Sequence, residues 1–165
     1  MTRLFVAVWP PDHVLDRLND LERPRDPGVK WVPIENLHIT LRFLGDADAD
    51  EVSDRLDHVV LPAASAVLGP AFDLLGERSL ITPVSGVDDL AAVVRQAVRG
   101  LGTERERKRF QGHITVARLA RHARPARSAG RPFEASFEVE EVALVASTLT
   151  DTGAVYETVA TWPTR

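Results

Sequence analysis

The sequence predicts an α+β fold in which strands near the C-terminus pair antiparallel. Two observations support this class. Short segments of alternating apolar residues are interspersed with three patterns at helical spacing. The last such segments also follow one another closely, with a turn at 151–153 between the final two. A length of 165 residues allows one sizeable core. Residues 1–165 are therefore expected to form a single domain.

The first part of the chain alternates between extended and helical patterns. Residues 3–9 carry β-branched and aromatic side chains in alternation, which predicts a buried strand. Apolar residues at helical spacing begin after Pro11 and stop before Pro24, so a helix occupies that interval. Residues 30–32 and 37–44 are expected to be extended again.

The middle of the chain predicts a second helix and two further strands. Asp46 or Asp48 can cap the helix, because a carboxylate there accepts hydrogen bonds from the first free N–H groups. Pro62 closes this helix. Strands are expected over residues 72–75 and 78–84.

A third helix and a run of strands complete the chain. Asp88 or Asp89 is expected to cap the helix, and Gly100 ends it. The remaining extended segments cover residues 113–119, 133–139, 142–149 and 155–162.

Composition excludes several classes of chemistry. The chain contains no cysteine, so disulfides, thiolate catalysis and Cys-ligated zinc are ruled out. No segment approaches the roughly 20 apolar residues that cross a bilayer. The apolar start is short and is followed at once by Pro10 and Pro11, without a signal-peptide cleavage pattern. We therefore expect a cytoplasmic protein with no membrane partner.

The charge is distributed unevenly. Residues 105–131 contain nine Lys or Arg residues and a single acid, Glu106, and so carry +8, whereas the rest of the chain carries −12. A positive segment on an acidic body suits a local anionic ligand. The alternative is a solvated basic loop that binds nothing.

One short motif occurs twice. The sequence His38-Ile39-Thr40-Leu41 returns 75 positions later as His113-Ile114-Thr115-Val116. In a strand, residues i and i+2 share a face, so each histidine projects beside its threonine. The intervening Ile39 and Ile114 point to the opposite face. Each copy is therefore an amphipathic strand, and a pseudo-twofold arrangement of the two would place two imidazoles across a cleft.

Two imidazoles with adjacent hydroxyls suit attack at phosphorus. In-line displacement needs one group that takes a proton from the nucleophile and another that donates to the leaving oxygen. Histidine can do both near neutrality, because its usual pKa is about 6.5. Thr40 and Thr115 could hold the non-bridging oxygens. Alternatives are two structural histidines or a metal site, although two imidazoles without a carboxylate at ligand spacing make a poor one.

At these residues the sequence resembles the two-histidine (2H) phosphoesterase superfamily, and within it the RNA 2′,3′-cyclic phosphodiesterases, also called 2′-5′ RNA ligases. The similarity covers residues 3–8, 30–45, 110–118 and 144–156. It implies a bilobal fold with two pseudo-symmetric lobes, two antiparallel sheets flanking a central cleft, and helices on the outside. It also implies hydrolysis of a 2′,3′-cyclic phosphate to the 2′-phosphate. His38 would then be the proton donor and His113 the proton acceptor. Gly112 departs from the proline that many members have there.

Three further residues are candidates for substrate contact. Arg42 lies two positions after Thr40, on the face predicted for the histidine, and could bind phosphate. Arg118 follows Thr115 by three, so it reaches the phosphate only if a bulge turns it. Phe110 precedes the second motif and could stack on a base.

The residues predict a hydrolase that acts at phosphorus as a monomer and needs no metal or cofactor, and the resemblance implies that its substrate is RNA or a nucleotide bearing a 2′,3′-cyclic phosphate. Reversible 2′-5′ ligation of RNA ends would use the same side chains. A non-catalytic RNA- or nucleotide-binding module is the alternative from another class.

Overall fold

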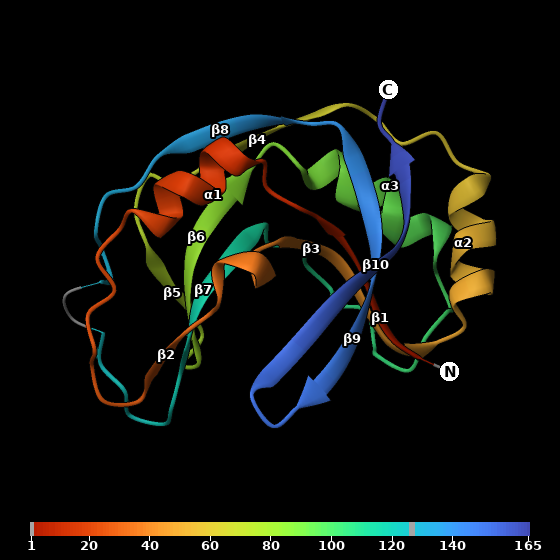
Figure 1. Ribbon diagram of the computed structural model, residues 1–165. Helices are drawn as coiled ribbons and strands as arrows, with labels where there is room; N and C mark the ends of the chain where they lie inside the picture. Colours follow the sequence, from red (N-terminus) through yellow and green to blue (C-terminus); the bar gives the residue numbers. More distant parts are fainter. Residues whose placement is uncertain (1, 126–127) are drawn as a thin grey trace.

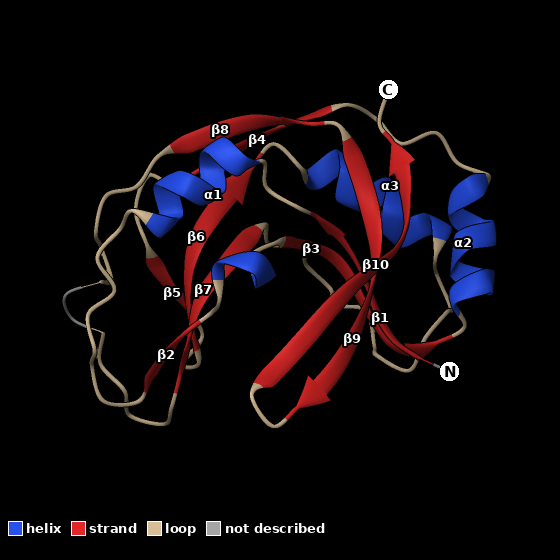
Figure 2. Cartoon of the chain, in the orientation of Figure 1, coloured by secondary structure: helices blue, strands red, loops and turns tan. Residues whose placement is uncertain are grey.

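The computed structural model describes residues 2–125 and 128–165, and most of its regular secondary structure is β-strand (Figure 2). The strands are β1 (Thr2–Val8), β2 (Val29–Trp31), β3 (Ile39–Ala47), β4 (Ala64–Leu68), β5 (Asp73–Leu75), β6 (Ser79–Ser85), β7 (His113–Leu119), β8 (Ala135–Val139), β9 (Glu141–Thr150) and β10 (Gly153–Pro163). They follow the order β10-β9-β1-β3-β7-β6-β4-β8, with β2 beside β7 and β5 beside β6. All of these strand pairs are antiparallel.

Three α-helices cover one face of the strands (Figure 1). They are α1 (Asp12–Asn19), α2 (Ala49–Asp57) and α3 (Asp88–Ala97), and a 3-10 turn, η1, spans Ile34–Asn36. Each helix buries an apolar stripe in the main core, through Val14 and Leu18, Val52 and Leu56, and Leu90, Ala91 and Val94. The elements alternate as their apolar periods predict, because each helix has to bury its stripe against the sheet.

The sheet divides into two halves that meet at one residue pair. Strand β3 ends the half β10-β9-β1-β3, and β7 begins the half β7-β6-β4-β8. Between them the register contains the single pair Ile39–Ile114. Both isoleucines are fully buried in the main core. The α+β class with antiparallel strands is confirmed, but the two predicted sheets are the halves of one ten-stranded sheet. The halves join through the second residue of each His-x-Thr motif.

Each motif strand contains an irregularity just after its threonine. Opposite β1, the partner of Ala7 is Thr40 and the partner of Val6 is Arg42, so Leu41 is an extra residue. In β7, Val116 is extra in the same way, because Thr115 pairs with Ile81 and Ala117 pairs with Leu80. Such β-bulges shift the alternation of side chains by one residue. The residues directly after the bulge therefore change face.

The predicted elements are present, with differences in detail. The Asp48 side chain caps α2 by accepting from Asp50 N at 2.9 Å. The expected cap of α3 by Asp88 or Asp89 is wrong, because both lie in its first turn and Val87 occupies the N-cap without a side-chain hydrogen bond. Strand β4 was not predicted, since only Ala66 and Leu68 on it are buried and its neighbours are small. No helix in the described ranges is long and apolar enough to span a membrane.

Candidate active site

The register between β3 and β7 brings the two motifs together. Ile39 lies opposite Ile114 in an antiparallel pair. The flanking positions then run in reverse, so His38 comes alongside Thr115 and Thr40 alongside His113. All four side chains are partly buried and lie on the face opposite the isoleucines, which we call the histidine face. Two hydroxyls and two imidazoles thus share one surface.

Each imidazole is oriented by a backbone carbonyl two residues earlier. His38 Nδ1–H donates to Asn36 O at 2.7 Å, and His113 Nδ1–H donates to Gln111 O at 2.6 Å. A carbonyl can only accept, so the proton of each neutral ring lies on Nδ1 and Nε2 is free to accept. In His38, Nε2 accepts from the Thr40 hydroxyl at 2.9 Å. Both neutral rings therefore present an unprotonated Nε2, which can accept a proton during catalysis.

Aromatic rings surround His38. The ring centroids of Phe5, Tyr156 and Trp9 lie 4.8, 5.5 and 5.7 Å from that of His38. Burial among them lowers the pKa of His38 from its usual value to about 4, because desolvation disfavours the charged imidazolium. The hydrogen bond to Asn36 opposes this decrease in pKa, and the positive charge of Arg118 adds to it.

His113 lies among cations instead. Its pKa is also lowered, first by burial and then by the positive charges of Arg107 and Arg118, while the hydrogen bond to Gln111 opposes the decrease. The positive charge of Arg118 lowers the pKa of both histidines. The histidine face is therefore aromatic beside His38 and cationic beside His113.

The two bulges decide which arginine reaches this face. The extra residue Val116 turns Arg118 to the same side as Thr115, where it is exposed and donates to Ser79 Oγ at 3.4 Å. The extra residue Leu41 has the same effect on β3. There it turns Arg42 away and leaves Phe43 on the histidine face.

The prediction that Arg42 contacts phosphate is wrong for this reason. Its side chain is only 9% exposed, and it donates to Glu104 O at 2.9 Å and to Phe43 O. Strict alternation along the strand had placed it beside His38, but alternation fails at a bulge.

The aromatic residues are also distributed differently from the prediction. Phe110 packs against the main core and is not among the rings beside His38. Phe43 instead packs with Phe5, Trp9 and Tyr156 in a small cluster on the histidine face. No local pattern could identify Tyr156, because it reaches His38 through pairing of β10 with β9 and of β9 with β1.

Asn36 links the site to the hairpin formed by β9 and β10. Its backbone oxygen holds His38, and its side-chain amide donates to Ala154 O at 3.0 Å. The hairpin that carries Tyr156 is thereby tied to the segment that orients His38. Asn36 was not singled out from the sequence, although its place two residues before His38 matches that of Gln111 before His113.

Gly112 allows the second motif to approach strand β6 closely. Val84 N donates to Gly112 O at 2.9 Å. A Cβ atom at position 112 would lie 2.4 Å from Val84 O, which is closer than such atoms can come. Glycine at this position therefore sets the path of the chain directly before His113.

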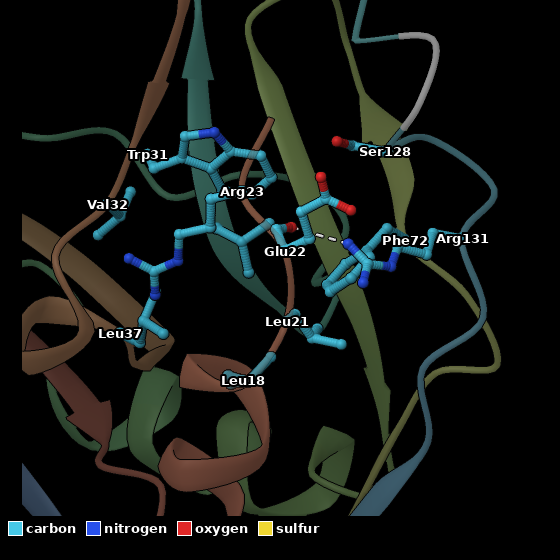
Figure 3. A pocket seen from close by; sticks show the side chains of 11 residues that line it. Leu18, Leu21, Glu22, Arg23, Trp31, Val32, Leu37, Phe72, Ser128 and Arg131 are labelled. Carbon is cyan, nitrogen blue, oxygen red and sulfur yellow. Dashed lines mark hydrogen bonds between the residues drawn. The ribbon is translucent and has the colours of Figure 1, made fainter. Parts of the chain in front are cut away.

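A separate apolar pocket lies on the other side of β7 (Figure 3). Val116 lines it from the face opposite His113, together with Leu18 and Leu21 from the end of α1 and its following loop, and Trp31 and Phe72. None of the predicted site residues lines it. In the described chain, no group of three or more His, Asp or Glu side chains lies close enough together to hold a metal ion.

Comparisons with known proteins agree with this geometry. Residues 8–65 match the family described as LigT like phosphoesterase. An RNA 2′,3′-cyclic phosphodiesterase of Archaeoglobus fulgidus is 31% identical, with 94% of this chain and 96% of that protein covered. One of Thermus thermophilus is 32% identical, with 93% of this chain and 86% of that protein covered. The crystal structure of Escherichia coli LigT complexed with 3′-AMP is 28% identical and has a TM-score of 0.79, covering 99% of this chain and 98% of that one.

The two-part antiparallel fold and its paired His-x-Thr strands define the class as a 2H phosphoesterase. Within that class, the chain belongs to the family of RNA 2′,3′-cyclic phosphodiesterases.

Proposed function

We propose that this protein hydrolyses the 2′,3′-cyclic phosphate of an RNA or nucleotide to the 2′-phosphate, using His38 and His113 as an acid–base pair. The Ile39–Ile114 register carries the proposal, because it sets both His-x-Thr motifs on one face of two adjacent strands. The names of the relatives support the same substrate class.

In the proposed reaction, a water molecule attacks phosphorus opposite the 3′-oxygen. His113 accepts the proton of the water as the new P–O bond forms. His38 donates a proton to the 3′-oxygen as its bond to phosphorus breaks, which leaves a 2′-phosphate and a free 3′-hydroxyl. Arg118 and the hydroxyls of Thr40 and Thr115 hold the non-bridging oxygens, whose negative charge must be stabilised. These side chains supply the acid, the base and the charge stabilisation without a metal or cofactor.

This division of roles requires that substrate binding change the pKa of His38. A ring whose pKa is about 4 is neutral near pH 7 in the free protein. An anionic phosphate beside it favours the imidazolium, so binding raises the pKa and loads the proton that His38 donates. The Thr40 hydroxyl, which donates to His38 Nε2 in the free protein, becomes available for phosphate when that nitrogen is protonated.

The rings beside His38 suit a nucleobase, in place of Phe110. Trp9, Phe43 and Tyr156 are only partly buried and lie on the histidine face. Stacking on an aromatic ring contributes about 1–3 kcal/mol per base. We further propose that the enzyme acts as a monomer in the cytoplasm; in support of the first, both motif strands come from one chain, so the site needs no second subunit.

The test is hydrolysis of cytidine 2′,3′-cyclic phosphate with EDTA present, followed by chromatography that separates 2′- from 3′-phosphate. We expect metal-independent formation of the 2′-phosphate. His38→Ala and His113→Ala should each lower kcat by about 10²–10⁴-fold, the usual effect of one proton-transfer group. His58→Ala is the matched control, because His58 is exposed and its ring bonds to the Asp54 carbonyl at 2.6 Å, on helix α2.

Absence of turnover by the wild-type protein, or wild-type rates in both histidine variants, would refute the proposal. Activity that appears only with added divalent metal would replace it with a metal mechanism. Formation of a 3′-phosphate would show that the 2′-oxygen leaves, which contradicts the proposed reaction.

A further inference from the structure

Asn36 forms hydrogen bonds in two directions. Its backbone oxygen accepts from His38 Nδ1 at 2.7 Å, and its side-chain Nδ2 donates to Ala154 O at 3.0 Å. Asn36 is the last residue of η1, and its own N–H donates to Pro33 O at 2.9 Å, which fixes its backbone within that turn. One partly buried residue therefore connects the imidazole of His38 to strand β10, 118 positions along the chain.

The bond to Ala154 attaches the far end of the β9–β10 hairpin. Strand β9 pairs with β1 from Ala143 to Ala146, and its residues after Ala146 have β10 as their partner in the described register. This end of the hairpin projects from the sheet as two strands (Figure 1). Two strands by themselves are marginally stable in water, so their position depends on contacts to other elements. The amide of Asn36 supplies one such contact.

The same end of the hairpin carries Tyr156. Ala154 and Tyr156 are two positions apart in β10, so they share a face of the strand. The ring of Tyr156 meets that of His38 edge-on, with 5.5 Å between the centroids and 88° between the planes. Asn36 therefore acts on His38 in two ways. Its carbonyl holds Nδ1, and its amide anchors the strand that places Tyr156 against the ring.

His113 has the first of these contacts without the second. Gln111 O accepts from His113 Nδ1 at 2.6 Å, as the carbonyl of Asn36 does for His38. The side chain of Gln111 is exposed, however, and within residues 2–125 and 128–165 it forms no hydrogen bond to another element. The link to a distant strand is thus particular to the His38 side of the site.

We propose that Asn36 is a positioning residue, whose side chain keeps His38 and Tyr156 in the arrangement that proton transfer requires. This inference rests on the proposed function, in which His38 donates to the 3′-oxygen. Asn36 acts through His38 and not on the substrate. Replacing its side chain removes the anchor at Ala154 and leaves the carbonyl that holds Nδ1. The resulting displacement matters, because an error of about 1 Å in a catalytic site can lower a rate about 10²-fold.

Asn36→Leu tests this role, because leucine has nearly the same shape and cannot donate a hydrogen bond. We expect kcat for cytidine 2′,3′-cyclic phosphate to fall about tenfold, the ratio that corresponds to the loss of one hydrogen bond. NMR titration of the free protein should show the pKa of His38 rising from about 4 toward 6.5, since the ring loses the cover of Tyr156. The charges of Arg118 and His113, which also act on His38, are the same in this variant, so the rise would report position.

Thr164→Val is the matched control. Thr164 Oγ1 donates to Val139 O at 2.7 Å, so this variant also removes one partly buried hydrogen bond from a side chain to a carbonyl, but at the end of β8. It should lose stability as Asn36→Leu does, with kcat and the pKa of His38 unchanged. In a Tyr156→Leu background, Asn36→Leu should raise the pKa of His38 little further, because the two substitutions remove the same contact.

An unchanged kcat together with an unchanged His38 pKa in Asn36→Leu would overturn the proposal. Equal changes in Thr164→Val, or additive changes in the double variant, would also overturn it. If Asn36→Leu does not fold, Asn36→Ala removes the same amide and is judged by the same two measurements. Wild-type protein that does not hydrolyse the substrate would refute the proposed function instead. The pKa titration needs no substrate, so it still decides whether Asn36 positions His38.

Discussion

Acidification should destabilise the protein through His38. The pKa of this histidine is about 4 in the folded chain, because the ring is buried among Phe5, Trp9 and Tyr156. In the unfolded chain it returns to about 6.5. The unfolded state therefore takes up a proton as the pH falls through 6.5, and the folded state does not until the pH nears 4. Between these values the unfolded state binds more protons, so stability decreases as the pH falls.

The magnitude follows from the two pKa values of His38. A difference of about 2.5 in pKa, at about 1.4 kcal/mol for each unit, amounts to about 3 kcal/mol at full effect. Most of this effect is reached by pH 4.5. Between pH 7 and pH 4.5 we therefore expect the free energy of unfolding to decrease by about 2.5 kcal/mol through His38. That is a large share of the roughly 5–15 kcal/mol by which a typical domain is stable.

Urea unfolding of the wild type and of His38→Gln at pH 7 and pH 4.5 measures this contribution. Carboxylates and His113 titrate in both proteins, so their effects cancel when the two pH dependences are subtracted. The wild type should lose about 2.5 kcal/mol more than the glutamine variant, whose side chain does not ionise. Equal losses in the two proteins would refute the burial argument, as would a His38 pKa near 6.5 by NMR titration.

Three further predictions concern catalysis and the core. Because the pKa values of His38 and His113 are both lowered in the free protein, the pH profile of kcat/KM should be bell-shaped with its maximum below pH 6.5. The profile of kcat should peak at higher pH, because bound phosphate raises the pKa of His38. A kcat/KM maximum in the alkaline range would contradict this prediction. Ile39→Ala should lower the free energy of unfolding in urea by about 2–5 kcal/mol, because its side chain is fully buried where the two halves meet, and a loss below 1 kcal/mol would argue against that role. Gly112→Ala should lower both stability and kcat, since the new Cβ would lie 2.4 Å from Val84 O and displace His113; wild-type kcat would show that the backbone adjusts freely.

Local sequence determined the elements and the reactive pair. Strand alternation put each histidine beside its threonine and each isoleucine in the core, and the Asp48 cap marked the start of α2. These features depend on contacts within a few residues, where periodicity and capping rules apply directly.

The tertiary structure alone decided which arginine faces the histidines. A bulge is defined by what the partner strand pairs with, so no count along β3 or β7 could show that Leu41 and Val116 are extra residues. For that reason Arg118 reaches the histidine face and Arg42 instead holds the loop of residues 102–109.

The surroundings of His38 were also set by tertiary structure. Trp9 and Tyr156 are far from it in the sequence; Trp9 reaches it through the pairing of β1 with β3, and Tyr156 through the pairing of β10 with β9 and of β9 with β1. The sequence by itself therefore determined that two His-x-Thr strands exist and what chemistry they suit. The difference between an aromatic surface around His38 and a cationic one around His113 arises from long-range pairing, which local patterns do not encode.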